Sequence, residues 1–158
     1  MAVPLSRRSV LAGLTTAGLV SACAAPDLTP EPDVAVLLGA ISDEENLISL
    51  YEKTASLHAD LPESCALALK DHRAHLETLR KHYLPGTGGV TATPSVASAS
   101  PAEPPAERSA ALALLRRTER AAAASRLKDV TAVAPGMSQL LASIGACESG
   151  HATALSLG

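Results

Sequence analysis

An apolar stripe at helical spacing runs through residues 137–155, and ionisable side chains interrupt it near its middle. Its members are Met137, Leu141, Ile144, Glu148, His151 and Leu155. Steps of three and four residues keep side chains on one face of an α-helix, so this stripe faces whatever the helix buries. The pattern predicts a helix over 137–155 that turns a carboxylate and an imidazole inward. These groups constrain the rest of the fold, because a lone buried charge is strongly destabilising.

Three earlier segments repeat this pattern. The first should begin at Asp33, a good N-cap, and run to about residue 59, with the stripe Leu37, Ile41, Glu44, Ile48, Tyr51 and Ala55. Glu45 lies one position off that line and is an alternative inward residue. The second covers 63–83, with the stripe Cys65, Leu69, His72, Leu76, Leu79 and Tyr83, and with His75 one turn further on. The third ends near residue 130 and has the stripe Leu112, Leu115, Glu119 and Ala122.

The composition favours helices over strands. The chain has no Phe or Trp and only two Tyr, so alanine supplies much of its 47% hydrophobic content. Residues 84–105 are rich in Gly, Ser, Thr and Pro and cannot support a core. Such a stretch reaches roughly 70 Å when extended, whereas a 24-residue helix is about 36 Å long. We therefore expect an all-α, antiparallel four-helix bundle with a long flexible connection between its second and third helices.

The first 22 residues have the features of an export signal. Arg7 and Arg8 precede a short apolar run, as in a twin-arginine signal peptide. Residues 20–23, Val-Ser-Ala-Cys, resemble a lipobox, in which the cysteine carries lipid. A plain signal peptide with a chance cysteine is the alternative, and Val10, where the twin-arginine pattern often has Phe, keeps general secretion open. The pattern predicts a lipoprotein attached through Cys23, with residues 23–32 as its tether, at the extracytoplasmic face of the cell membrane.

The charge balance and the motif content narrow the classes of function. The chain has a net charge of −3, and because the signal carries two arginines, the part from Cys23 onward is at −5. No basic face stands out, which argues against a nucleic-acid partner. The sequence has no zinc-finger spacing, phosphate-binding glycine loop or nucleophile elbow, and no catalytic residue can be picked out.

The helical register makes a prediction about the two remaining cysteines. If the second and fourth helices are antiparallel with His72 level with His151, Cys65 and Cys147 are offset by roughly 16 Å along the axis. A disulfide needs Cα atoms within about 7 Å. We therefore predict that both thiols are free.

Two blocks of sequence resemble the halves of a known family. They are ENLISLYEKTASLHADLPESCALALKDHRAHLETLR, and LLRRTERAAAASRLKDV followed by SQLLASIGACESGHATAL. They resemble an actinobacterial ferritin-like domain, a family often carried on exported lipoproteins, and the resemblance covers 34–83 and 107–156. It implies a ferritin-like bundle whose core residues could hold Fe, Mn or Zn, namely Glu44, His72, His75, Glu119, Glu148 and His151.

The resemblance is incomplete in the second helix. Di-metal bundles take a Glu-x-x-His pair from each of two helices, and Glu148 with His151 supplies one pair. The second helix has His72 and His75 at the corresponding positions, with Asp71 as the nearby acid. Replacing a bridging carboxylate by an imidazole removes a negative charge, so a single-metal site and a metal-free bundle are both alternatives to a di-metal centre.

Each of these groups also has a purely structural interpretation. Glu119 lies in a charged stretch and could be solvated or paired with Arg116. The histidines of the second helix could be bonded to Asp71 or Glu44, and internal water could satisfy the remaining groups. Glu44 also lies in the polar first half of its helix, where acids suit the helix dipole.

Two functions follow as expectations. The first is an exported, lipid-anchored ferritin-like protein that binds metal in its core. The second is a metal-free helical-bundle lipoprotein that acts as an interaction or assembly module of the cell envelope. A bundle with so thin a core could gain stability as a homodimer or with an envelope protein partner.

Overall fold

The computed structural model describes residues 32–82 and 102–156, which contain four α-helices and no strand. They are α1 (Pro32–Leu57), α2 (Glu63–His82), α3 (Arg108–Asp129) and α4 (Pro135–Ala154). The all-α prediction is confirmed. Each helix end that was predicted at a numbered residue lies within two residues of its observed position. Among these helices, none is long and apolar enough to span a membrane.

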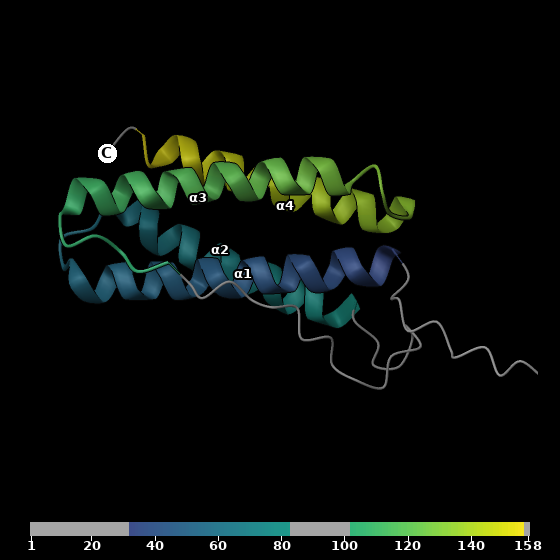
Figure 1. Ribbon diagram of the computed structural model, residues 1–158, viewed down its shortest axis with the longest axis horizontal. Coiled ribbons are helices and arrows are strands. Elements are labelled where there is room, and N and C mark those ends of the chain that lie inside the picture. The colour runs from purple at the N-terminus through teal and green to yellow at the C-terminus, as the bar shows by residue number, and fades with distance from the viewer. Residues whose placement is uncertain (1–31, 83–101, 157–158) are drawn as a thin grey trace, which may run out of the picture.

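The helices form two antiparallel pairs that lie one on the other (Figure 1). α1 pairs with α2 and α3 with α4, and the pairs meet where α1 faces α3 and α2 faces α4. The end of α1 lies beside the start of α3, since the His58 ring is 3.1 Å from the Pro105 carbonyl. The start of α1 lies beside the α3–α4 turn, where the Asp33 carboxylate accepts a hydrogen bond from the Ala134 backbone N–H at 3.2 Å.

In this arrangement the end of α2 lies far from the start of α3. α2 ends toward the end of the bundle where α1 begins, because Leu79 of α2 packs in one cluster with Leu37 and Ala40 of α1. α3 begins at the opposite end (Figure 1). Residues 83–101, which make up most of the predicted connection, lie outside the described part of the chain. The predicted signal with Arg7 and Arg8, the lipid attachment at Cys23 and the tether to residue 31 also lie outside it.

Two local expectations differ from the structure. α1 begins at Pro32, a residue suited to the first turn of a helix, so Asp33 lies inside that turn and binds Ala134 instead of capping its own helix. Residues 102–105, expected as the end of the flexible connection, lie against α1, where Glu103 pairs with Lys53. The following Glu107 caps α3 by accepting from the backbone N–H groups of Ser109 and Ala110.

The core has an apolar cluster toward each end of the bundle and a charged layer between them. One cluster contains Leu47, Leu50, Tyr51, Cys65, Ala68, Leu115, Ala122 and Leu155. The other contains Leu37, Ala40, Leu79, Leu141 and Ile144. Cys65 and Cys147 are both free, as the predicted register requires. The His72 and His151 rings lie 5.1 Å apart between their centroids, so the two histidines are level as expected.

Candidate metal centre

The charged layer is built from side chains of all four helices. Glu44 of α1, His72 of α2, Glu119 of α3 and Glu148 of α4 are each 0% exposed. The side chains of His75 and His151 are 17% and 11% exposed, at the edges of the layer. All six predicted residues therefore lie in the middle of the bundle, at the depth that the helical stripes predicted.

His72 lies between two buried carboxylates. Its Nδ1 is 2.8 Å from Glu44 Oε2, and its Nε2 is 2.8 Å from Glu119 Oε1. Because an ionised carboxylate only accepts hydrogen bonds, both ring nitrogens must donate, which requires the charged imidazolium. Burial lowers the pKa of His72, but the hydrogen bonds with Glu119 and Glu44 outweigh it and raise this pKa to about 9. His72 is thus an internal cation that joins α1 to α3.

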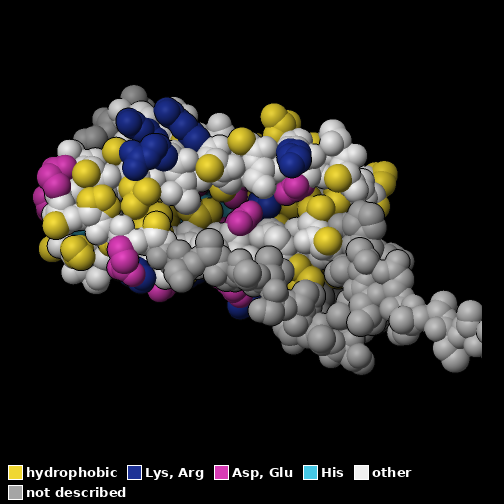
Figure 2. Space-filling view, viewed as in Figure 1, with side chains coloured by type: hydrophobic (Ala, Val, Ile, Leu, Met, Phe, Trp, Pro, Cys, Tyr) yellow, Lys and Arg dark blue, Asp and Glu magenta, His cyan; other side chains and the backbone are white. Residues whose placement is uncertain are grey.

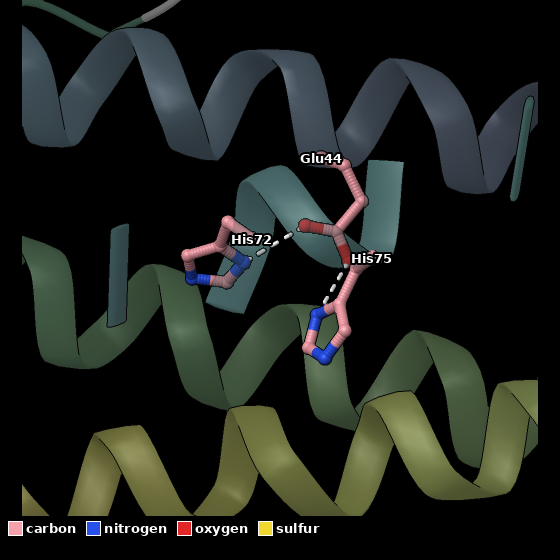
Figure 3. A group of neighbouring side chains, drawn as sticks. All are labelled: Glu44, His72 and His75. Atoms are coloured by element: carbon pink, nitrogen blue, oxygen red, sulfur yellow. Dashed lines mark hydrogen bonds and ion pairs between the residues drawn. The ribbon is translucent and has the colours of Figure 1, made fainter. Parts of the chain in front are cut away.

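Glu44 faces His72 and His75 of α2 (Figure 3). One of its carboxylate oxygens binds His72, and the other, Oε1, lies 3.3 Å from His75 Nδ1, too poorly aligned for a hydrogen bond. Burial favours the neutral acid, but the two imidazoles outweigh it and lower the pKa of Glu44. This carboxylate is therefore ionised and presents one oxygen without a hydrogen bond.

Glu119 is held by three neighbours. Tyr51 donates its hydroxyl to Glu119 Oε1 at 2.5 Å, and the two nearest imidazoles approach the same oxygen, His72 at 2.8 Å and His151 at 3.4 Å. Burial raises the pKa of Glu119, but the interactions with His151, His72 and Tyr51 lower it to about 2. The same contact with Glu119 raises the pKa of His151 against the effect of burial. Tyr51, seven residues after Glu44, thus belongs to the layer.

Glu148 is placed differently from the other carboxylates. Its nearest charged neighbour is Arg126, whose Nε lies 3.8 Å from Glu148 Oε1. The terminal nitrogens of Arg126 bind Asp43 of α1 at 2.8 Å and Asp129 of α3 at 3.2 Å. On the face shown in Figure 2, acidic and basic side chains lie next to one another between α3 and α1. Burial therefore dominates and raises the pKa of Glu148 to about 8, although Arg126 opposes the shift.

Arg126 is the buried charge that sequence reasoning missed. Its side chain is 1% exposed. It follows Ala122 by four residues and so continues the stripe of α3, but the long stem of an arginine usually reaches solvent from such a position. Gly145 of α4 makes room for it, because a Cβ at that position would lie 2.9 Å from the Arg126 Cβ. In the sequence, Gly145 is a sign of this close approach, but it can be interpreted only when α3 is known to pack against α4.

The structure decides among several of the purely structural interpretations of these residues. Glu45 is exposed and binds Arg80, so it is not the inward residue of α1. Glu119 is neither solvated nor paired with Arg116. His72 is hydrogen-bonded to Glu44, one of the two partners considered, and His75 forms a longer ion pair with the same carboxylate at 3.3 Å.

Two groups in the layer have the composition and spacing of metal ligands. Glu44, His72 and His75 form one, and His72, Glu119 and His151 form the other; within each group the candidate ligand atoms lie within 4.8 Å of one another. The two groups share His72, whose two nitrogens face opposite carboxylates. Glu148 belongs to neither group, so the structure brings together five of the six predicted ligands and places the sixth beside Arg126.

The layer also contains buried polar atoms that make no hydrogen bond. Seven of them belong to the layer, namely Glu44 Oε1, His75 Nδ1, Glu119 Oε2, Arg126 Nε, both carboxylate oxygens of Glu148, and His151 Nδ1. Five of the seven lie in longer ion-pair contacts of 3.3 to 3.8 Å, and Glu119 Oε2 and Glu148 Oε2 are in none of these contacts. Leaving a buried polar atom without a hydrogen bond costs about 1–3 kcal/mol, against about 5–15 kcal/mol for the net stability of a domain. A cation bound by carboxylates and imidazoles would satisfy several of these atoms together, so the residues present fit a divalent metal.

The carboxylates and imidazoles of the charged layer can bind a metal cation or, as at His72, the proton of a charged imidazole. No protein-family model, curated protein or solved structure matches this chain. The function therefore has to be argued from these residues alone.

Proposed function

We propose that this protein binds a divalent metal ion, Fe(II), Mn(II) or Zn(II), in the core of its helical bundle. The observation that carries the proposal is the set of fully buried oxygen and nitrogen atoms without hydrogen bonds, grouped around ligand-type side chains from all four helices. A structural role for these charges would favour complete pairing, because unpaired buried polar groups are costly. A metal ion would compensate them and, when bound, would supply Lewis acidity or redox chemistry.

Glu44 and His75 are the residues we assign first to the metal. Glu44 is ionised, and its Oε1 lies 3.3 Å from His75 Nδ1 without a hydrogen bond between them. Glu44 Oε1 and His75 Nδ1 thus point toward one another, and both can bind the same metal ion (Figure 3). His72 can complete this group, or it can join Glu119 and His151 in the second one.

His72 sets the condition for binding. In the hydrogen-bonded arrangement it carries a proton on each nitrogen and neutralises part of the charge of Glu44 and Glu119. A metal ion that uses His72 must displace one of these protons, so metal binding and protonation of His72 compete. Metal affinity should consequently rise with pH through the range in which His72 titrates.

The location of the protein is a second part of the proposal. The sequence around Arg7, Arg8 and Cys23 supports export and lipid attachment at the extracytoplasmic face of the membrane. The resemblance to ferritin-like lipoproteins is consistent with this, and the helix directions of the described bundle agree with a long crossing connection. We infer a lipid-anchored metal-binding protein of the cell envelope.

A second function is favoured by the same histidine. His72 with its two carboxylates is a fully bonded internal salt bridge, so the bundle can also close without metal. In that case the ionisable layer fixes the register of the helices, and the protein acts as an envelope interaction module through its helix surfaces.

Metal titration separates the two. The chain, freed of metal with a chelator and kept reduced, is titrated with Mn(II) and anaerobically with Fe(II), and the heat of binding and the melting temperature are measured. The proposal predicts binding and a raised melting temperature, both lost in Glu44→Gln and both retained in Glu45→Gln, the exposed neighbour. The absence of binding, with an unchanged melting temperature, would favour the metal-free module.

A further inference from the structure

A second cluster of ligand-type side chains lies between α2 and α4, at the edge of the charged layer. Asp71 of α2 approaches Cys147 and His151 of α4, and their candidate ligand atoms all lie within 4.8 Å of one another. Asp71 Oδ2 is 3.2 Å from His151 Nε2, and Cys147 Sγ is 3.4 Å from the same nitrogen. Cys147 and His151 are four residues apart and so lie on one face of α4. Three ligands of different chemistry converge at this point.

The cluster differs from the core groups in its access to solvent. The side chain of Asp71 is 47% exposed and that of His151 is 11% exposed, whereas Glu44 and His72 are fully buried. Cys147 is half-buried. A hydrated cation can therefore reach this cluster without opening the bundle.

His151 is oriented by a carboxylate on its inner side. Its Nδ1 lies 3.4 Å from Glu119 Oε1, while its Nε2 faces Asp71 and Cys147. Metal-bound imidazoles commonly direct their second nitrogen at a carboxylate, which fixes the tautomer and increases the basicity of the ligand. Glu119 Oε1 is thus the carboxylate oxygen that faces a proton on Nδ1, and a cation at the surface would take the place of the Nε2 proton that now faces Asp71.

We propose that Asp71, Cys147 and His151 form a surface site for a thiophilic divalent cation of the Zn(II) type, separate from the core metal centre. Thiolate, imidazole and carboxylate are the ligand types that Zn(II) takes in proteins, and three protein ligands leave a fourth position for water. Binding displaces two protons, the thiol proton of Cys147 and the Nε2 proton that His151 donates to Asp71, and both pass to solvent. Asp71 and Cys147 belong to neither core group, and the core group of Glu44, His72 and His75 shares no residue with this site.

Co(II) is a suitable probe, because a Co(II)–thiolate bond gives an intense charge-transfer absorption that oxygen and nitrogen ligands lack. The full chain, reduced and freed of metal, is titrated with Co(II) and the near-ultraviolet and visible spectra are recorded. We expect the thiolate band in the wild type and its loss in Cys147→Ser. Cys65→Ser, which changes the other described thiol, should retain the band. Asp71→Asn should weaken Co(II) binding about tenfold or more, or about 1.4 kcal/mol.

The same titration in Glu44→Gln distinguishes this site from the core centre. The surface site predicts that the thiolate band persists in Glu44→Gln, even if Mn(II) binding is lost there. Co(II) binding without a thiolate band, or a band that survives in Cys147→Ser, would overturn the surface site and leave the core proposal standing. A band in the wild type, with no binding of Mn(II) or Fe(II) and no loss of bound Co(II) in Glu44→Gln, would support the surface site and reject the core centre.

Discussion

His72 Nε2 lies 2.8 Å from Glu119 Oε1, a buried contact that joins α2 to α3 across the interface of the two helix pairs. With the equivalent contact to Glu44, it places a positive charge between two negative ones in a layer closed to solvent. In the middle layer of this bundle, charged side chains thus occupy the positions that large apolar side chains fill toward its two ends.

Removing the charge of His72 should destabilise the metal-free bundle severely. His72→Gln leaves Glu44 and Glu119 buried without their common cation, and breaking a buried pair in this way costs about 3–5 kcal/mol. Urea unfolding followed by circular dichroism measures the loss. His82→Gln, at the exposed end of α2, is the control and should change the free energy of unfolding little. Equal stability of the His72 variant and the wild type would show that the layer is hydrated and the charges unpaired.

The stability of the metal-free protein should fall as pH rises above mildly acidic values. The pKa of Glu148 is raised from 4.5 to about 8, so between these values the folded protein binds a proton that the unfolded chain has released. Stability then decreases with increasing pH. His72, whose pKa is raised from 6.5 to about 9, adds stability that is complete below 6.5 and is lost as pH rises through 9.

Acid should destabilise the protein for a different reason. The pKa of Glu119 is lowered from 4.5 to about 2, so its stabilising contribution is present above 4.5 and is lost as pH falls toward 2. Melting temperatures measured across pH should therefore be highest near a pH of about 5. In Glu148→Gln the part of the decline between 4.5 and 8 should disappear, and Glu45→Gln should leave it intact. A profile that rises steadily toward pH 8 in metal-free protein would contradict these assignments.

The packing of α4 on Arg126 can be tested with two glycines of the same helix. Gly145→Ala puts a Cβ 2.9 Å from the Arg126 Cβ, between two backbones that cannot both stay in place. Overpacking of this kind costs about 1–3 kcal/mol. Gly150→Ala meets nothing within 4 Å, so the better helix propensity of alanine should leave the protein equally stable or up to about 1 kcal/mol more stable. The difference in unfolding free energy between the two variants is the readout, and its absence would contradict the close approach.

The fold was largely predictable, because helical periodicity and proline-rich breaks depend on local sequence. The stripes placed Glu44, His72, Glu119 and Glu148 at core depth, and each is buried. The partners of these residues were not predictable, because they depend on how helices distant in sequence are rotated against one another. Glu148 shows this most clearly. Its position on the stripe suggested a ligand beside His151, and the structure places it next to Arg126 instead.

The contacts among Asp71, Cys147 and His151 could not be predicted from the sequence either. Asp71 was visible as the acid next to His72, and Cys147 as an unpaired thiol, but sequence gave no reason to connect them. They meet because α2 and α4 are antiparallel and level at His72 and His151. Contacts of this kind appear only when the register between helices is known.

The central claim is that the charged layer binds a divalent metal, and the metal content of the isolated protein tests it most directly. The chain is purified without chelator and analysed by elemental mass spectrometry beside Glu44→Gln and Glu45→Gln. We predict about one or two equivalents of Fe, Mn or Zn in the wild type and in Glu45→Gln that are lost in Glu44→Gln, in addition to any Zn at Asp71, Cys147 and His151, which all three proteins retain. Metal-free wild type, or equal metal in all three proteins, would contradict the proposal and leave His72 as the permanent cation of the core.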